Sequence, residues 1–78
     1  MQNQTIPKRY AEVDISGKVR AVAAEYRSSQ SQLADALHIS RMAITRRMSG
    51  DVQWSARELA VLADHFGVPI ARFYGDAA

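Results

Sequence analysis

The sequence has no cysteine, and only two of its 78 residues are proline. Without cysteine there is no disulfide framework, no thiolate zinc site and no cysteine nucleophile, so packing alone must stabilise the core. No apolar run comes near the roughly 20 residues that are needed to cross a bilayer. A chain this short buries only about 60 to 65% of its unfolded surface, which is enough for one compact core. These features exclude a two-domain enzyme and favour a small cytoplasmic domain with no membrane contact.

Glycine and histidine are scarce and scattered. The glycines stand at positions 17, 50, 67 and 75, too far apart to form a phosphate-cradling loop. The two histidines, His38 and His65, are far apart in the sequence, and the serines stand where they can cap helices. We therefore expect a protein that is not an enzyme, with no metal site, no other cofactor and no small-molecule ligand.

Helical periodicity dominates the interval between Pro7 and Pro69, where apolar residues do not alternate as they do in strands. The expected fold class is therefore all-α. Five helices are predicted, over residues 16–27, 29–37, 40–48, 55–66 and 69–74. Their apolar stripes predict a core made of Val19, Val22, Ala23, Tyr26, Leu33, Ala34, Leu37, Ile44, Met48, Leu59, Leu62, Ala63 and Phe66.

Several of these helices have recognisable ends. The spacings of Ser29 with Gln32 and of Ser55 with Glu58 predict two capping boxes, in which each side chain satisfies a free backbone N–H of the first turn. Gly67 stands where a left-handed residue is expected to end a helix. The remaining N-caps are expected at Ser40 and at either Asp14 or Ser16.

The helices define one domain, which we place at residues 14–75. A flexible polar tail is expected at residues 1–13 and a short C-terminal end at 76–78. Within the tail, Lys8 and Arg9 are either part of a disordered segment or a flexible basic arm of the kind that reaches a DNA minor groove in related architectures.

Positive charge is concentrated on the third predicted helix. Between Leu37 and Gly50 the chain has three arginines and no acid, a local charge of +3, and the remainder sums to −1, giving the net charge of +2. Only about three residues separate this helix from the one before it. Two helices joined by such a turn, with the second short and basic, form a helix-turn-helix arrangement, whose second helix enters the DNA major groove.

The segment from Ser29 to Gly50 resembles the signature of the Cro and phage-repressor (XRE) type helix-turn-helix proteins. The shared features are the cap and glutamine that open the second helix, the Leu-Ala in its middle, the Ile-Ser before the third helix, Ile44 and the closing glycine. The resemblance continues from Ser55 to Tyr74. It implies a compact five-helix bundle of the lambda-repressor-like kind, with the helix-turn-helix at helices two and three.

Carried over residue by residue, the resemblance implies specific DNA contacts. Base-reading positions fall on Arg41, Met42, Thr45 and Arg46, and phosphate-contacting positions fall on Gln30 and Ser40. The side-chain chemistry agrees, since arginine pairs with guanine, threonine or methionine contacts a thymine methyl, and helix N-termini favour phosphate. At position 47 the family usually has an apolar residue; we expect Met48 to replace its packing and Arg47 to be free for the phosphate backbone. His38 replaces the usual turn glycine.

These observations predict a sequence-specific regulator of transcription that binds an operator in double-stranded DNA, with a repressor of phage or mobile-element type as the favoured form. The alternative is a protein-interaction module, such as an antitoxin or accessory factor, with secondary DNA binding. Ile70, Phe73 and Tyr74 form either a homodimer surface or a lid on the core. Trp54 is expected in a structural role beside the core.

Overall fold

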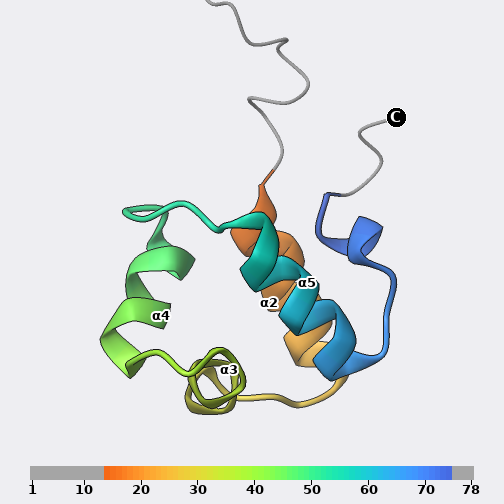
Figure 1. Ribbon diagram of the computed structural model, residues 1–78, viewed down its shortest axis with the longest axis horizontal. Coiled ribbons are helices and arrows are strands. Elements are labelled where there is room, and N and C mark those ends of the chain that lie inside the picture. The colour runs from red at the N-terminus through yellow and green to blue at the C-terminus, as the bar shows by residue number, and fades with distance from the viewer. Residues whose placement is uncertain (1–13, 75–78) are drawn as a thin grey trace, which may run out of the picture.

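The protein is described here from a computed structural model, which describes residues 14–74. Helix α2 (Ile15–Glu25) is followed by α3 (Gln30–Leu37), α4 (Arg41–Ser49), α5 (Ala56–Phe66) and the 3₁₀ helix η1 (Ile70–Phe73) (Figure 1). No strand occurs within this range, so the all-α prediction is confirmed. The prediction of five α-helices is wrong by one, because the last element closes with i→i+3 bonds such as Arg72 N–H to Pro69 O (3.0 Å).

Every α-helix of the described range begins at a capping side chain. In each case an oxygen accepts a hydrogen bond from the backbone N–H three residues later, and the caps are Asp14, Ser29, Ser40 and Ser55. Both predicted capping boxes are complete, with Gln32 and Glu58 reaching back to the cap N–H. Since Asp14 caps α2, the hydroxyl of Ser16 is available for contacts elsewhere.

Left-handed residues end three of the helices. His38 closes α3 with φ 58°, and Gly50 and Gly67 close α4 and α5 with φ 89° and 71°. The prediction for Gly67 is confirmed. His38 adopts the left-handed conformation that the family's glycine would adopt, and the Ile39 N–H then bonds to Ala34 O at 3.0 Å, which turns the chain directly into α4.

The core follows the predicted apolar stripes with four differences: Leu37 and Phe66 are only partly buried against it, Tyr26 lies outside it, and Phe73 belongs to it. Its buried residues are Val19, Val22, Ala23, Leu33, Ala34, Ile44, Met48, Leu59, Leu62, Ala63 and Phe73. Tyr26 does not belong to it, because α2 ends at Glu25 and the ring is 51% exposed, stacked on Phe66. Phe73 is fully buried, so of the two roles predicted for it the burial favours the lid on the core over the dimer surface.

Helix α4 lies at one end of the described part of the molecule, and η1 lies at the other (Figure 1). Helix α3 packs against both α4 and α5, and α2 also packs against α4, whereas η1 packs against α2 and α5. Among residues 14–74, none of the helices combines the length and the apolar character that crossing a bilayer requires. Helix α4 is therefore supported from the side of α2 and α3 and lies at the edge of the bundle.

The burial of Phe73 leads to a prediction about stability. Replacing Phe73 by alanine should lower the free energy of unfolding by about 3 to 5 kcal/mol, because a cavity replaces a fully buried ring. The matched control is Ile70→Ala in the same element, whose side chain is 39% exposed and should contribute far less. Urea unfolding monitored by circular dichroism measures both. Equal losses for the two variants would contradict the lid function of Phe73.

Candidate nucleic-acid interface

Helix α4 is fixed by one face, and its opposite face is open. Ile44 is fully buried and Met48 is 9% exposed, so these two residues set the rotation of the helix against the core. Residues 42, 45, 46 and 49 share the opposite face because they follow the i, i+3, i+4, i+7 spacing of a helix. All four are exposed, and Met42, at 62%, is the most exposed of the large hydrophobic side chains in the described range.

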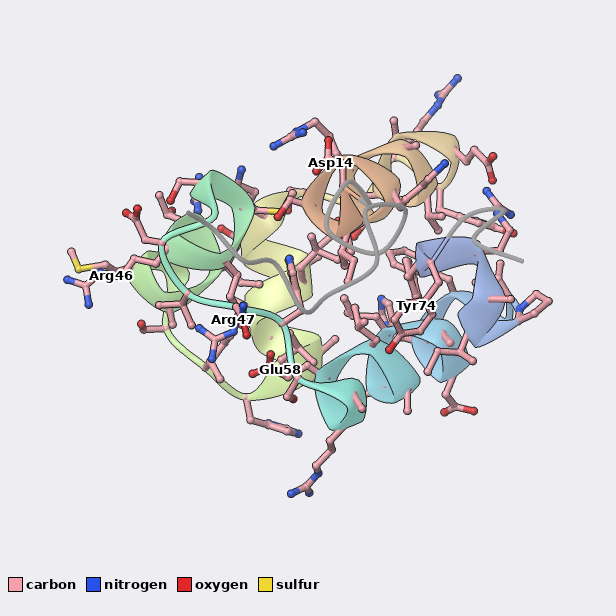
Figure 2. The ribbon with its side chains drawn as sticks, turned by 90° about the horizontal axis from the view of Figure 1, so that it is seen from above. Asp14, Arg46, Arg47, Glu58 and Tyr74 are labelled. Carbon is pink, nitrogen blue, oxygen red and sulfur yellow. The ribbon has the colours of Figure 1, made fainter. Side chains whose placement is uncertain are left out.

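The four predicted base-reading residues are brought together on this part of α4. Arg41, Met42, Thr45 and Arg46 are all exposed. Figure 2 shows the side chain of Arg46 extending away from the bundle, whereas its neighbour Arg47 turns back toward Glu58. The two adjacent arginines therefore have different surroundings, and only Arg46 points to solvent.

Two of these side chains also make contacts within the motif. The Nη1 of Arg41 donates to the Oγ of Ser31 at 2.9 Å, which ties the first turn of α4 to α3. The Oγ1 of Thr45 donates to the carbonyl oxygen of Arg41 at 3.1 Å. Because the hydroxyl hydrogen of Thr45 is used inside the helix, this side chain offers a ligand its methyl group and no free donor.

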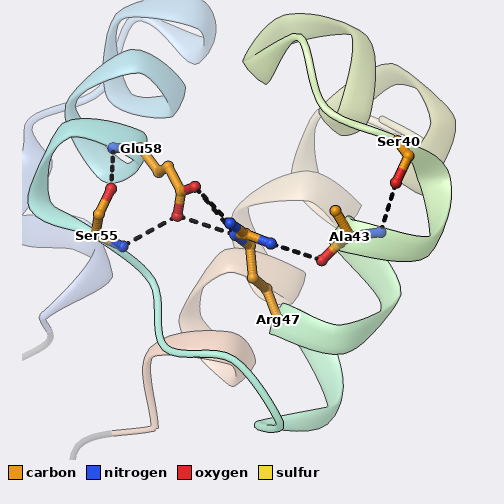
Figure 3. Close-up of polar contacts among 5 residues, drawn as sticks. All are labelled: Ser40, Ala43, Arg47, Ser55 and Glu58. Atoms are coloured by element: carbon orange, nitrogen blue, oxygen red, sulfur yellow. Dashed lines mark hydrogen bonds and ion pairs between the residues drawn. The ribbon is translucent and has the colours of Figure 1, made fainter.

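The sequence predicts a free Arg47, but in the structure its side chain is bound to α5 (Figure 3). Its Nε donates to both carboxylate oxygens of Glu58, at 3.0 and 3.1 Å, and its Nη2 lies 2.9 Å from Oε2. The Nη1 donates to the carbonyl oxygen of Ala43 at 2.9 Å. The two side chains are only 16% and 18% exposed. The expectation that Arg47 is free is therefore wrong, because a carboxylate and a backbone carbonyl already bind its guanidinium group.

The carboxylate of Glu58 serves two helices. Partial burial alone would raise the pKa of the Glu58 carboxyl, but the hydrogen bonds from Arg47 and Ser55 and the positive charge of Arg47 outweigh it. The net effect is a pKa below the ordinary value. Sequence reasoning identified Glu58 only as part of a capping box, and its opposite charge to Arg47 was the signal that could have indicated the pair.

The C-terminal end of α4 is held by α2 as well. The Oγ of Ser16 donates to the carbonyl oxygen of Arg47 at 2.7 Å and accepts the Nε1–H of Trp54 at 3.0 Å. Arg20 donates through Nη2 to the carbonyl oxygen of Met48 at 3.4 Å. The structural role predicted for Trp54 is confirmed, since the half-buried ring packs on the core. The roles of Ser16 and Arg20 had no local sequence signal, because their partners lie about thirty residues away in the chain.

The remaining predicted residues lie at three separate places. Gln30 is half-buried in the first turn of α3, and Ser40 is exposed, with its Oγ accepting the Ala43 N–H at 3.0 Å. Ile70 and Tyr74 stand at η1 with 39% and 37% exposure, at the end opposite α4. The predicted tail and its basic pair, Lys8 and Arg9, lie outside the described residues.

Comparison with known proteins agrees with this geometry. A family model described as helix-turn-helix matches residues 20–73, which is more than half of the chain. The matched range contains α3, the turn, α4, α5 and η1. Neither the curated proteins nor the solved structures gave a match.

The lowered pKa of Glu58 predicts a pH dependence of stability. Because the folded-state pKa lies below that of the unfolded chain, the contribution of this carboxylate is complete above the unfolded value, roughly pH 4. It is lost as the pH falls through the folded-state pKa. In urea titrations between pH 2 and 7, Glu58→Gln should destabilise at neutral pH and approach the parent at low pH. A constant difference across this range would contradict the assignment.

Proposed function

This chain belongs to the helix-turn-helix family of the Cro and phage-repressor (XRE) type, a family of DNA-binding domains, and we propose that it is a sequence-specific regulator that binds an operator in double-stranded DNA. The observation that carries the proposal is the open face of α4. A short helix is held at the edge of the bundle by Ile44 and Met48, while arginine, methionine and threonine side chains cover its other side.

The exposed side chains suit the edges of base pairs. Arg46 extends from the bundle and can donate two hydrogen bonds to the O6 and N7 of a guanine. Met42 and Thr45 offer apolar groups that match the C5-methyl of thymine. Arg41 is one turn before Thr45 and extends the same reading surface toward α3. The proposed operator therefore combines guanine and thymine contacts within one major groove.

Contacts to phosphate would fix the position of α4 in the groove. Gln30 stands in the first turn of α3, where backbone N–H groups and the helix dipole favour an anion. The Oγ of Ser40 accepts a backbone hydrogen bond, which leaves its hydroxyl hydrogen as a donor to a phosphate oxygen. We assign phosphate contacts to these two residues and none to Arg47.

The proposed mode of action is repression by occupation of the operator. A protein bound in the major groove excludes polymerase sterically, which requires no catalytic group and no cofactor. A monomer would read one half-site, and a two-fold dimer would read two half-sites about 34 Å apart. Such a dimer would use the exposed side chains of Ile70, in η1, and of Tyr74, which directly follows it. Sedimentation with and without DNA distinguishes the two modes.

Selection of bound sequences from a random DNA pool tests the proposal. The parent protein should enrich one short motif, and Arg46→Ala should bind that motif about 1 to 3 kcal/mol more weakly and accept other bases at one position. The matched control is Arg72→Ala, which makes the same charge change at the far end and breaks only the exposed pair with Glu25. A pool without an enriched motif would favour the protein-interaction alternative.

The methyl contacts are tested by changing the DNA. Replacing thymine by deoxyuridine throughout the selected site removes the C5-methyl groups and keeps every base hydrogen bond. Each lost contact should weaken binding about fourfold, since a buried methyl-sized group contributes about 0.8 kcal/mol. Met42→Ala should reduce the difference between thymine and deoxyuridine sites, and Arg46→Ala should preserve it. Titrations by fluorescence anisotropy measure all six affinities. Identical affinity of the parent for both sites would contradict the methyl contacts.

A further inference from the structure

We propose that the ion pair between Arg47 and Glu58 positions α4 for base reading, so that Glu58 contributes to operator affinity without touching DNA. The proposal rests on the operator-binding function given above and deepens it. It assigns to Glu58, a residue of α5, an effect on the exposed side chains of α4. Both residues are called positioning residues, because they act through the orientation of the helix.

The geometry of the pair restrains rotation as well as distance. Three contacts of 2.9 to 3.1 Å join the guanidinium group to the two carboxylate oxygens. A planar fork that meets a planar carboxylate is satisfied in few relative orientations. The fourth contact, from Nη1 to the carbonyl oxygen of Ala43, binds the same guanidinium to the backbone of its own helix. A rotation of α4 would break the three contacts with Glu58 together, because the guanidinium group turns with its own helix.

Glu58 is itself held rigidly. Its Oε1 accepts the backbone N–H of Ser55 at 3.0 Å, and the Ser55 Oγ accepts the N–H of Glu58 at 3.0 Å. Figure 3 shows how this capping box fixes the carboxylate at the start of α5, facing Arg47. The acceptor is therefore anchored to the body of the domain, and a contact with it transfers that rigidity to α4.

The other capping box shows which part of Glu58 the pair requires. At α3, Gln32 completes the box with Ser29, and its Oε1 accepts the cap N–H at 2.8 Å. An uncharged amide thus suffices for a cap in this chain. The negative charge and the second oxygen of Glu58 are not needed by Ser55 and are used by Arg47. Glu58→Gln should therefore keep the cap of α5 and weaken the contact with α4.

The consequence for base reading follows from the position of Arg47 in the helix. It directly follows Arg46, and Thr45 is two residues before it, so a change in the rotation of α4 moves both reading side chains. Recognition sites tolerate displacements of only about 0.5 Å or 10 to 20°. Ile44 and Met48 fix the apolar side of the helix, and the pair with Glu58 adds a restraint on the side that faces α5.

Two single variants with opposite charge changes test the proposal. Arg47→Met removes a positive charge and Glu58→Gln removes a negative one, so simple attraction to DNA would weaken the first and strengthen the second. Positioning predicts the same direction for both. Each should bind the selected operator about 3- to 30-fold more weakly, and the double variant should be no weaker than the worse single variant. Affinity for a scrambled duplex should change far less for Glu58→Gln.

The matched control is Glu25→Gln, which makes the same substitution in the exposed pair with Arg72 at the other end of the molecule. Its operator affinity should stay within about twofold of the parent. All titrations are made at a temperature where circular dichroism shows each variant fully folded. Arg47→Lys, which keeps the charge and loses the fork, should fall between the parent and Arg47→Met.

Three results would overturn the proposal. If the Glu58→Gln variant binds the selected operator as tightly as the parent does, the pair does not position α4. A plot of log affinity against log salt concentration whose slope is smaller in magnitude by about 0.9 in Arg47→Met alone shows that Arg47 contacts a phosphate directly. Failure of the parent itself to prefer any sequence rejects the operator-binding function, and the positioning role with it. The last result is read from the parent and is therefore distinct from the other two.

Discussion

Burial of one face of α4 is the constraint on which the rest of the structure depends. A helix of nine residues is too short to be stable on its own, so its tertiary contacts decide whether it forms. Ile44 is fully buried and Met48 nearly so, and both lie on the side that meets α2 and α3. The same contacts that make α4 stable also determine which side chains remain exposed. The stability of α4 and the choice of its exposed side chains therefore depend on the same contacts.

Polar contacts complete what the small core cannot supply. The carbonyl oxygens at the end of α4 accept bonds from Ser16 and Arg20, both on α2, and Arg47 is bound by Glu58 on α5. Hydrogen bonds and ion pairs restrain the orientation of the helix, whereas apolar packing restrains it only weakly because the hydrophobic effect is not directional. A chain without cysteine has no covalent restraint for this purpose. The carboxylate of Glu58, which also caps α5, connects the start of one helix to the orientation of another.

What could be predicted from the sequence depended on the distance between partners in the chain. Caps, capping boxes and the left-handed Gly67 involve neighbours within a few residues, and the structure has them as predicted. The exposed face of α4 also followed, because the burial of Ile44 and Met48 sets the phase of the helix. The pairing of Arg47 was missed and the role of Phe73 was left open, because their environments depend on how α5 and η1 fold back, which no local spacing encodes.

The pairing of Arg47 also changes how charge should contribute to DNA binding. The three arginines of α4 supply +3, and Glu58 contributes −1 beside them, so the local charge is +2. Attraction to phosphates alone gives affinity without sequence preference. Because part of that attraction is cancelled, the proposed function requires a larger share of operator affinity to come from the geometry of Arg46, Met42 and their neighbours. Under the proposed function, such a domain would gain discrimination between sequences at the expense of general affinity for DNA, as a regulator among many competing sites requires.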